Sequence, residues 1–366
     1  MDKPRYSVKF DPHLGLYRWR VEEGVWLLTE PLPTARRSDL CVVALGGGTG
    51  LPVVLKGLKA ALFPSGPAWV RTTELHRLTA IVTVSDDGGS SGRLRREHGV
   101  LPPGDVRNCL LALSDGDPLI ARLFDFRFDG QGGTAGHSLG NLILTALSQI
   151  QNGFDQAVER GGKLLTIRGQ VFPSSLDPVT LRAEFTDGTS VSGESKVAER
   201  RRPIRRVFLE PAEARAVPRV LTALEASDLI VLGPGSLYTS LIPILLVKEI
   251  AEAIAHSRAR VVLVGNLMSE PGETDGYTMA DHVEAIRQHV PQVPIHDVLL
   301  NTTAISRDLA DQYAGQGAVP VPVAQERILA LGCRAVEDDL LAAGPKIRHD
   351  PAKLAHALLG LGRLTD

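Results

Sequence analysis

Residues 41–51 are Cys-Val-Val-Ala-Leu-Gly-Gly-Gly-Thr-Gly-Leu, a short apolar segment that ends in a cluster of glycines. The pattern predicts a buried strand and a tight turn, and the apolar residues beyond it recur at helical spacing. Glycines let backbone N–H groups approach an anion closely, and the N-terminus of the following helix also favours negative charge. We therefore expect a phosphate to bind at this turn, which consists of Gly46, Gly47, Gly48, Thr49 and Gly50.

This first glycine turn differs from two common phosphate-binding motifs. Leu51 replaces the third glycine of the dinucleotide fingerprint, and the Lys-Ser/Thr pair of a P-loop is absent. Taken alone, the turn fits a structural bend in an α/β sheet about as well as it fits a binding site.

A second strand, glycine turn and helix occupy residues 228–240, Asp-Leu-Ile-Val-Leu-Gly-Pro-Gly-Ser-Leu-Tyr-Thr-Ser. Gly233 and Gly235 shape the predicted turn, and Ser236 is expected to cap the helix. In a doubly wound sheet, two such turns lie on either side of the crevice where the strand order reverses. The two turns together therefore indicate a ligand-binding crevice much more strongly than either does alone.

A polar loop follows the predicted buried strand at residues 78–84, and it contains Asp86, Asp87 and Arg93. Two adjacent carboxylates suit Mg²⁺ or a ribose hydroxyl, and an arginine suits phosphate. Loops that follow consecutive parallel strands share one sheet edge, so both aspartates should face the first glycine turn across the crevice. The alternative is that the aspartates only form a turn and the arginine lies on a solvated surface.

Other polar candidates lie near predicted helix starts. Asp105 is expected to cap a helix whose first turn carries Arg107 and Asn108. His137 and Asn141 are one helical turn apart, so they share a face. A single histidine is usually structural, but this pair follows a glycine-rich loop and supplies candidate catalytic residues. The remaining predicted ligand contacts are Asn266 and Arg348.

The composition is that of an ordinary soluble protein. Of the 366 residues, 43% are hydrophobic and 22% are charged, and the formal net charge is −2. This balance gives no support for binding to nucleic acid or to a membrane surface. The three cysteines lie far apart in apolar patterns, which predicts reduced core residues in a cytoplasmic protein. The longest apolar segment is interrupted by Pro243, Lys248 and Glu249, so no membrane span is expected.

The chain divides into an N-terminal arm and one large domain. Residues 1–38 are rich in aromatic side chains and are expected to form two short extended pieces and a linker. Residues 39–366 are expected to form a Rossmann-like α/β domain with a doubly wound, mostly parallel sheet. Between residues 163 and 210 the hydrophobic pattern changes from helical to alternating, and Asp187-Gly188 supplies a hairpin turn. This stretch predicts a small β-rich insertion.

Five motifs together resemble one known family. They are Gly-Gly-Gly-Thr-Gly (46–50), Thr-Val-Ser-Asp-Asp-Gly-Gly-Ser-Ser-Gly-Arg (83–93), Pro-Pro-Gly-Asp-Val-Arg-Asn (102–108), Gly-His-Ser-Leu-Gly-Asn (136–141) and Gly-Pro-Gly-Ser-Leu-Tyr-Thr-Ser (233–240). From about residue 40 onward, the chain is similar to the YvcK branch of the CofD-like family, the gluconeogenesis factors. The resemblance implies a Rossmann-like fold, cytoplasmic location and binding of nucleotide sugars such as UDP-N-acetylglucosamine. It also implies a role in growth on gluconeogenic carbon sources and in cell shape.

The related transferase branch moves phospholactate from a guanosine diphosphate-type donor to a deazaflavin alcohol with Mg²⁺. Its acidic loop is shorter than the loop at residues 83–93 in this chain. This departure argues against deazaflavin binding but leaves a site for a diphosphate nucleotide.

Three functional hypotheses follow. The first is a regulatory protein that binds a nucleotide sugar between the glycine turns, with protein partners whose activity it modulates. The second is a Mg²⁺-dependent phosphotransferase with a nucleotide-diphosphate donor, in which Asp86 or Asp87 holds the metal and His137 or Asn141 orients the acceptor. The third, an NAD-dependent oxidoreductase, is weakened by Leu51 at the third glycine position. A UDP-sugar is thus preferred to NAD as the ligand, and a homo-oligomer is expected.

Overall fold

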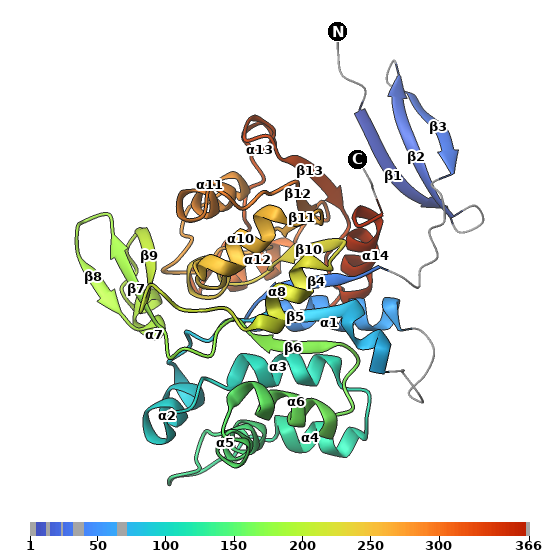
Figure 1. Cartoon of the computed structure of the whole chain (residues 1–366). Coiled ribbons are helices and arrows are strands. Elements are labelled where there is room, and N and C mark those ends of the chain that lie inside the picture. Colours follow the sequence, from blue (N-terminus) through green and yellow to red (C-terminus); the bar gives the residue numbers. More distant parts are fainter. Residues whose placement is uncertain (1–4, 12–14, 23–24, 32–39, 64–71, 364–366) are drawn as a thin grey trace.

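The computed structural model describes residues 5–11, 15–22, 25–31, 40–63 and 72–363. In this part of the chain, the main sheet has seven strands, all parallel, in the order β13-β12-β11-β10-β4-β5-β6 (Figure 1). The strands are β4 (Val42–Gly46), β5 (Leu78–Val82), β6 (Gln170–Pro173), β10 (Leu229–Leu232), β11 (Arg260–Val264), β12 (Asp297–Asn301) and β13 (Arg334–Asp338).

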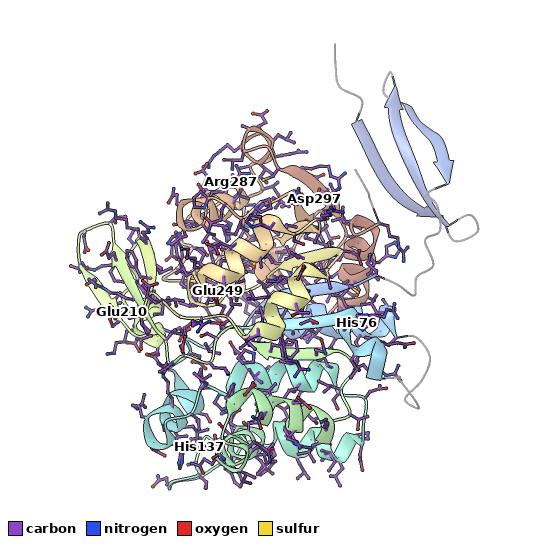
Figure 2. All side chains as sticks on the ribbon, in the orientation of Figure 1. His76, His137, Glu210, Glu249, Arg287 and Asp297 are labelled. Atoms are coloured by element: carbon purple, nitrogen blue, oxygen red, sulfur yellow. The ribbon has the colours of Figure 1, made fainter. Side chains whose placement is uncertain are left out.

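Three neighbouring strands, β10, β4 and β5, are almost entirely apolar because both faces of the sheet are covered. Every residue of β4, β5 and β10 is buried, as expected for a parallel sheet with helices on each side. Asp297, labelled in Figure 2, is a charged residue that is fully buried at the start of β12. It forms ion pairs with Arg260 and Arg334 from the two neighbouring strands. The predicted Rossmann-like α/β fold is confirmed.

The strand order reverses between β4 and β10. From β4 the chain steps outward through β5 to β6, and from β10 it steps the other way through β11, β12 and β13. The first crossover helix, α1 (Gly50–Leu62), packs on α14 (Pro351–Leu361), whereas α10 (Lys248–His256) packs on α8 (Pro218–Glu225). Right-handed crossovers that run in opposite directions place their helices on opposite faces, which is the doubly wound arrangement.

A group of helices connects β5 to β6 and lies at the bottom of Figure 1. Asp117 and Ser138 cap α4 and α5, since each side chain accepts a hydrogen bond from the first turn of its helix. The helices are α2 (Gly89–His98), α3 (Gly104–Leu113), α4 (Pro118–Asp125), α5 (Leu139–Gln151) and α6 (Phe154–Leu164).

The β-rich insertion forms a separate antiparallel sheet in the order β8-β7-β9. Its strands are β7 (Thr180–Phe185), β8 (Ser190–Ser192) and β9 (Ile204–Glu210), and α7 (Glu194–Glu199) lies between β8 and β9. The hairpin of β7 and β8 turns at Asp187-Gly188, as predicted. The small sheet starts later than residue 163, because residues 170–173 pair with β5 in the main sheet.

The remaining elements complete the C-terminal half and the N-terminal arm. Helix α11 begins with a capping box between Thr278 and Asp281. The arm contains three strands rather than two extended pieces: β1 (Arg5–Asp11), β2 (Gly15–Glu22) and β3 (Val25–Pro31). The other elements are η1 (Thr72–Arg77), η2 (Leu237–Leu241), α9 (Ile242–Leu245), α11 (Met279–His289), α12 (Arg307–Ala314) and α13 (Gln325–Ala330). Among the described helices, none is both long and apolar enough to cross a membrane.

Candidate functional site

The two glycine turns meet directly at the carboxyl ends of β4 and β10. A Cβ atom added to Gly50 would lie 2.2 Å from the carbonyl oxygen of Pro234, and one added to Gly235 would lie 3.6 Å from that of Gly47. Gly48 and Gly235 also have positive φ angles of 59° and 144°. The glycines are therefore required for backbone contact between the turns as well as for turn geometry.

The first glycine turn is held by side chains of α3. The Gly48 N–H donates a hydrogen bond to the Asp105 carboxylate, and Asn108 Nδ2 donates to the Gly48 carbonyl over 3.4 Å. The prediction that Asp105 caps α3 is wrong, because Pro103 occupies the N-cap position and no side chain caps the helix. Asp105 instead lies inside the first turn of α3 and reaches across to the glycine turn.

The second glycine turn is held in a similar way from the loop that follows β11. Asn266 accepts a hydrogen bond from the Gly235 N–H and donates one to the Gly235 carbonyl, both over 3.0 Å. The Ser236 hydroxyl donates to Glu270 over 2.9 Å rather than to the backbone of its own helix. Glu273 accepts from the Thr239 hydroxyl over 2.8 Å. Polar side chains of the protein thus already contact several of the N–H and O–H groups that the sequence predicts to bind phosphate.

Asp86 and Asp87 follow β5 as predicted, but their side chains bind different elements. Asp86 accepts from the Gly88 N–H over 2.9 Å and hydrogen-bonds Ser91 at the start of α2. Asp87 accepts from the Ser195 N–H over 2.8 Å and so attaches the loop to α7 of the insertion. Of the two aspartates, Asp86 therefore lies on the crevice side of the loop, whereas Asp87 attaches the loop to the insertion.

Several carboxyl groups at this edge of the sheet have raised pKa values. Burial raises the pKa of Asp105 to about 6, and it raises that of Asp86. Burial, with repulsion from Asp86 and Asp87, raises the pKa of Glu194 to about 8. Burial and the nearby Glu270 raise the pKa of Glu273 to about 8. Such a concentration of buried carboxyl groups with raised pKa values is typical of a functional site.

Sequence reasoning missed Glu194, Glu270 and Glu273. Glu270 and Glu273 could have been found, because they follow β11, a strand that ends at the same sheet edge as the two glycine turns. Glu194 carries no comparable signal, since it lies in the insertion and approaches the loop after β5 only in the folded protein. A Cβ atom added to Gly88 would lie 4.0 Å from Glu194 Oε2.

His137, which is labelled in Figure 2, and Asn141 of α5 both hydrogen-bond the Ser90 hydroxyl of α2. Arg93, on the same helix as Ser90, donates to the Ala135 carbonyl over 2.6 Å. Arg107 is buried and forms an ion pair with Asp125 over 2.7 Å.

Arg348 is exposed, and no described contact of its side chain joins it to either glycine turn. The structure thus gathers the glycine turns, the acidic loop, Asn108 and Asn266 at one edge of the sheet, with His137 and Asn141 on Ser90 of α2. Arg348 precedes His349, whose Nε2 donates to the carbonyl of Gly265 next to Asn266 over 3.1 Å.

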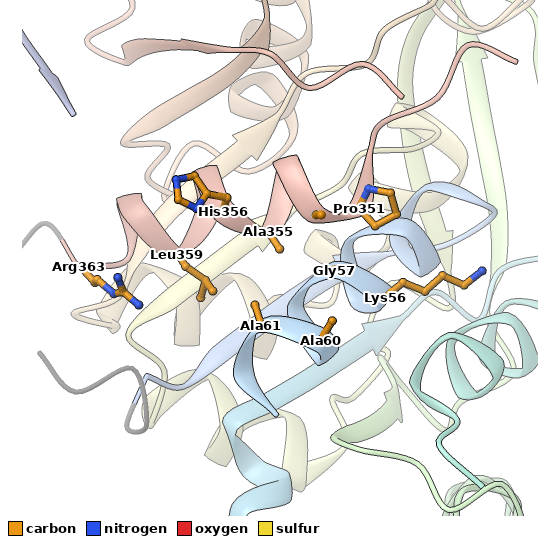
Figure 3. Close-up of a pocket in the computed structure, with 10 residues that line it drawn as sticks. Lys56, Gly57, Ala60, Ala61, Pro351, Ala355, His356, Leu359 and Arg363 are labelled. Atoms are coloured by element: carbon orange, nitrogen blue, oxygen red, sulfur yellow. The ribbon is translucent and has the colours of Figure 1, made fainter. Parts of the chain in front are cut away.

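Two further observations concern a possible metal site and a groove elsewhere on the molecule. In the described part of the chain, no group of three or more His, Cys, Asp or Glu side chains is arranged to hold a metal ion. A groove of about 370 Å³ lies between α1 and α14, lined by small residues that include Gly57, Ala60 and Ala355 (Figure 3). It runs along the second half of α1, whereas the first glycine turn precedes that helix, so the groove is separate from the crevice.

The fold and the crevice define a class: a doubly wound α/β protein with two glycine turns at the point where its strand order reverses, which is where open α/β sheets bind their ligands. The family model "2-phospho-L-lactate transferase CofD" matches residues 42–341. The chain belongs to the CofD family.

Within this family, the chain is similar to proteins named gluconeogenesis factor. It is 44% identical to the one from Halalkalibacterium halodurans, over 87% of this chain and 95% of that protein. It is 43% identical to the one from Bacillus subtilis, over 87% and 97% of the two chains. A crystal structure of a UPF0052 family member from Bacillus halodurans superposes with a TM-score of 0.82 at 43% identity, and covers 88% of this chain and 99% of that one.

Proposed function

We propose that the protein is a cytoplasmic gluconeogenesis factor that regulates metabolism and cell shape by binding a nucleotide sugar such as UDP-N-acetylglucosamine. The contact between the two glycine turns at the reversal of the strand order carries this proposal. In open α/β sheets, this crevice outside the carboxyl ends of the strands is where nucleotides bind. The names of the relatives support the metabolic role. Regulated protein partners and a homo-oligomer belong to the same proposal.

The carboxylates around the crevice set a condition for diphosphate binding. A diphosphate placed beside Asp86 and Glu194 would be repelled unless a cation or protons neutralised part of the charge. Mg²⁺ usually binds one or two carboxylates together with substrate phosphates, so the donor set fits although it forms no complete cage by itself. When bound, Mg²⁺ would neutralise phosphate charge. Asp86 would hold it, because Asp87 is engaged with the backbone of Ser195.

Calorimetry tests the nucleotide-sugar proposal directly. We expect UDP-N-acetylglucosamine with Mg²⁺ to release or absorb heat on binding and to raise the melting temperature, whereas Mg²⁺ alone should give neither effect. The reason is that the described protein groups form no metal site without the phosphates. Absence of heat and of a thermal shift at millimolar nucleotide sugar would refute the proposal.

The two aspartates after β5 should differ on mutation. Asp86→Asn is expected to weaken binding of the Mg²⁺–nucleotide complex by about tenfold, or about 1.4 kcal/mol. Its thermal stability should change little, because the weaker hydrogen bond from the Gly88 N–H is offset by removal of a carboxylate whose burial raises its pKa. Asp87→Asn should instead lower the melting temperature, because the Ser195 N–H loses a charged acceptor at 2.8 Å. Titration calorimetry and thermal melts on both variants check this. Equal effects of the two substitutions on affinity would contradict the division of roles.

A phosphotransferase is the second candidate, favoured by the family model that matches the chain. In this reading, Asp86 would hold Mg²⁺, and His137 or Asn141 would orient the acceptor, since positioning and electrostatics supply most of the catalysis in phosphoryl transfer. The test is Mg²⁺-dependent release of nucleoside monophosphate from a panel of diphosphate donors. If the wild type releases nucleoside monophosphate and Asp86→Asn does not, the protein is a transferase. If no donor in the panel gives release, only the binding function is supported.

A further inference from the structure

Ser90, His137 and Asn141 form a buried cluster between the first turns of α2 and α5. The Ser90 hydroxyl lies 2.8 Å from His137 Nδ1 and 3.0 Å from Asn141 Nδ2. His137 and Asn141 are each only 2% exposed. Ser90 lies 47 residues from His137 in the sequence, and the packing of α2 against α5 brings the two residues together.

The donors and acceptors of this cluster can be assigned from its hydrogen bonds. The Asn141 amide N–H donates to Ser90 Oγ, which leaves the serine hydrogen for His137 Nδ1. Nδ1 is then an acceptor, and the ring is neutral with its hydrogen on Nε2. Burial and the nearby Arg93 lower the pKa of His137, which agrees with a neutral ring.

One polar atom of the cluster has no partner. Asn141 Oδ1 is buried and accepts no hydrogen bond in the described part of the chain. A buried acceptor without a donor costs about 1–3 kcal/mol, so such atoms usually mark a place that a ligand or water fills. The amide faces the first turn of α2, because its nitrogen contacts Ser90 there. A bare phosphate or carboxylate oxygen cannot satisfy Oδ1, since the missing partner is a hydrogen-bond donor.

The cluster adjoins the crevice. Ser91, the next residue along α2, accepts a hydrogen bond from the Gly104 N–H over 3.1 Å and contacts Asp86. Gly104 begins α3, whose Asp105 binds the first glycine turn. The first turn of α2 therefore carries both Ser90, which contacts the Asn141 amide, and Ser91, which contacts the acidic loop, and a helix N-terminus favours a phosphate.

We propose that this cluster is the sugar subsite: Asn141 Oδ1 accepts a hydrogen bond from a hydroxyl or amide N–H of the sugar, while Ser90 and His137 hold the amide in that orientation. The inference rests on the proposed nucleotide-sugar function and adds a specificity-determining residue to it. The geometry requires the ligand group at this position to be a hydrogen-bond donor.

Titration calorimetry with two ligands, UDP and UDP-N-acetylglucosamine, tests the subsite. Asn141→Leu keeps the side-chain volume but removes the acceptor, and we expect it to weaken UDP-N-acetylglucosamine binding by about tenfold while UDP binding stays unchanged. Ser90→Ala frees the amide to rotate and should have a smaller effect of the same kind. Thr145→Val is the matched control, because this hydroxyl is also buried on α5 and donates only to the Asn141 carbonyl.

The outcomes separate the subsite from the function on which it rests. If the wild-type protein binds neither nucleotide, both proposals fail. If it binds both ligands and Asn141→Leu and Ser90→Ala alter their affinities equally or not at all, the nucleotide site stands and the sugar subsite is refuted. Should Asn141→Leu not fold, Ser90→Ala decides together with the wild-type comparison, in which UDP-N-acetylglucosamine must bind more tightly than UDP.

Discussion

Replacing Gly50 by alanine is expected to destabilise the protein by about 3 kcal/mol and to abolish binding of the nucleotide sugar. The new methyl group would lie 2.2 Å from the carbonyl oxygen of Pro234, a distance at which backbone must move. The displaced group belongs to the second glycine turn, so the substitution would separate the two walls of the crevice. Alanine favours helix more than glycine by about 1 kcal/mol, which is too little to compensate.

Gly48→Ala provides the matched control for this prediction. Gly48 belongs to the same turn, and no atom lies within 4 Å of an added Cβ, but its φ angle is 59°. The expected cost is therefore the left-handed backbone penalty alone, about 1–2 kcal/mol. Urea unfolding measures both variants. Equal losses in the two would show that contact between the turns is not what requires glycine at position 50.

The fold and the location of the site could be predicted because they depend on local patterns. The apolar segments before Gly46 and Gly233 predict parallel strands that are buried on both faces, and the helical spacing after each turn predicts the crossover helices. Two strand–glycine–helix units then imply a crevice where the strand order reverses. The position of Asp86 beside that crevice follows from the same rule, because loops after parallel strands share one edge.

The acidic lining could not be predicted in full because it depends on tertiary contacts. Asp105 has the residue type of a helix cap, but in the folded chain the helix begins at Gly104, and Asp105 in its first turn accepts a hydrogen bond from the Gly48 N–H of the first glycine turn. Glu194 reaches the site from the start of α7 in the insertion, and no local pattern in the sequence indicates where the insertion packs. Asp87 is engaged with the insertion and Asp86 is not, and this difference likewise depends on where α7 packs.

The acidic lining has a consequence for stability that can be measured without any ligand. The pKa of Glu194 rises from 4.5 to about 8 on folding, and that of Asp105 rises from 3.8 to about 6. Each carboxyl therefore holds its proton to higher pH in the folded state than in the unfolded state. Its contribution to stability is complete below pH about 4 and is lost as the pH rises through the folded-state pKa.

Buried histidines act in the opposite direction and limit stability on the acid side. Burial lowers the pKa of His349 from 6.5 to about 4, so the unfolded state binds the extra proton between these values. Stability from this group is present above pH about 6.5 and falls as the pH decreases towards 4. His349 and the carboxyl groups act against each other between pH 4 and 6.5, and above that range the effect of Glu194 remains, so we expect the protein without ligand to lose stability from pH 6.5 to pH about 8.

Glu194→Gln should remove part of the loss at high pH, because an amide does not ionise beside Asp86 and Asp87. At pH 5 the variant and the wild type should differ least in melting temperature, since this is just above the unfolded-state pKa of 4.5. Between pH 5 and 8 the wild type loses up to about 1.4 kcal/mol per pH unit from this group, so the variant should melt increasingly higher up to pH about 8, and the difference should stay level from there to pH 9. Glu199→Gln, at the exposed end of the same helix, is the control and should show no pH-dependent difference from the wild type. Thermal melts of the three proteins from pH 5 to 9 provide the measurement. A constant difference between Glu194→Gln and the wild type across this range would mean that Glu194 is ionised throughout and that the crevice does not hold its carboxyl in the protonated form.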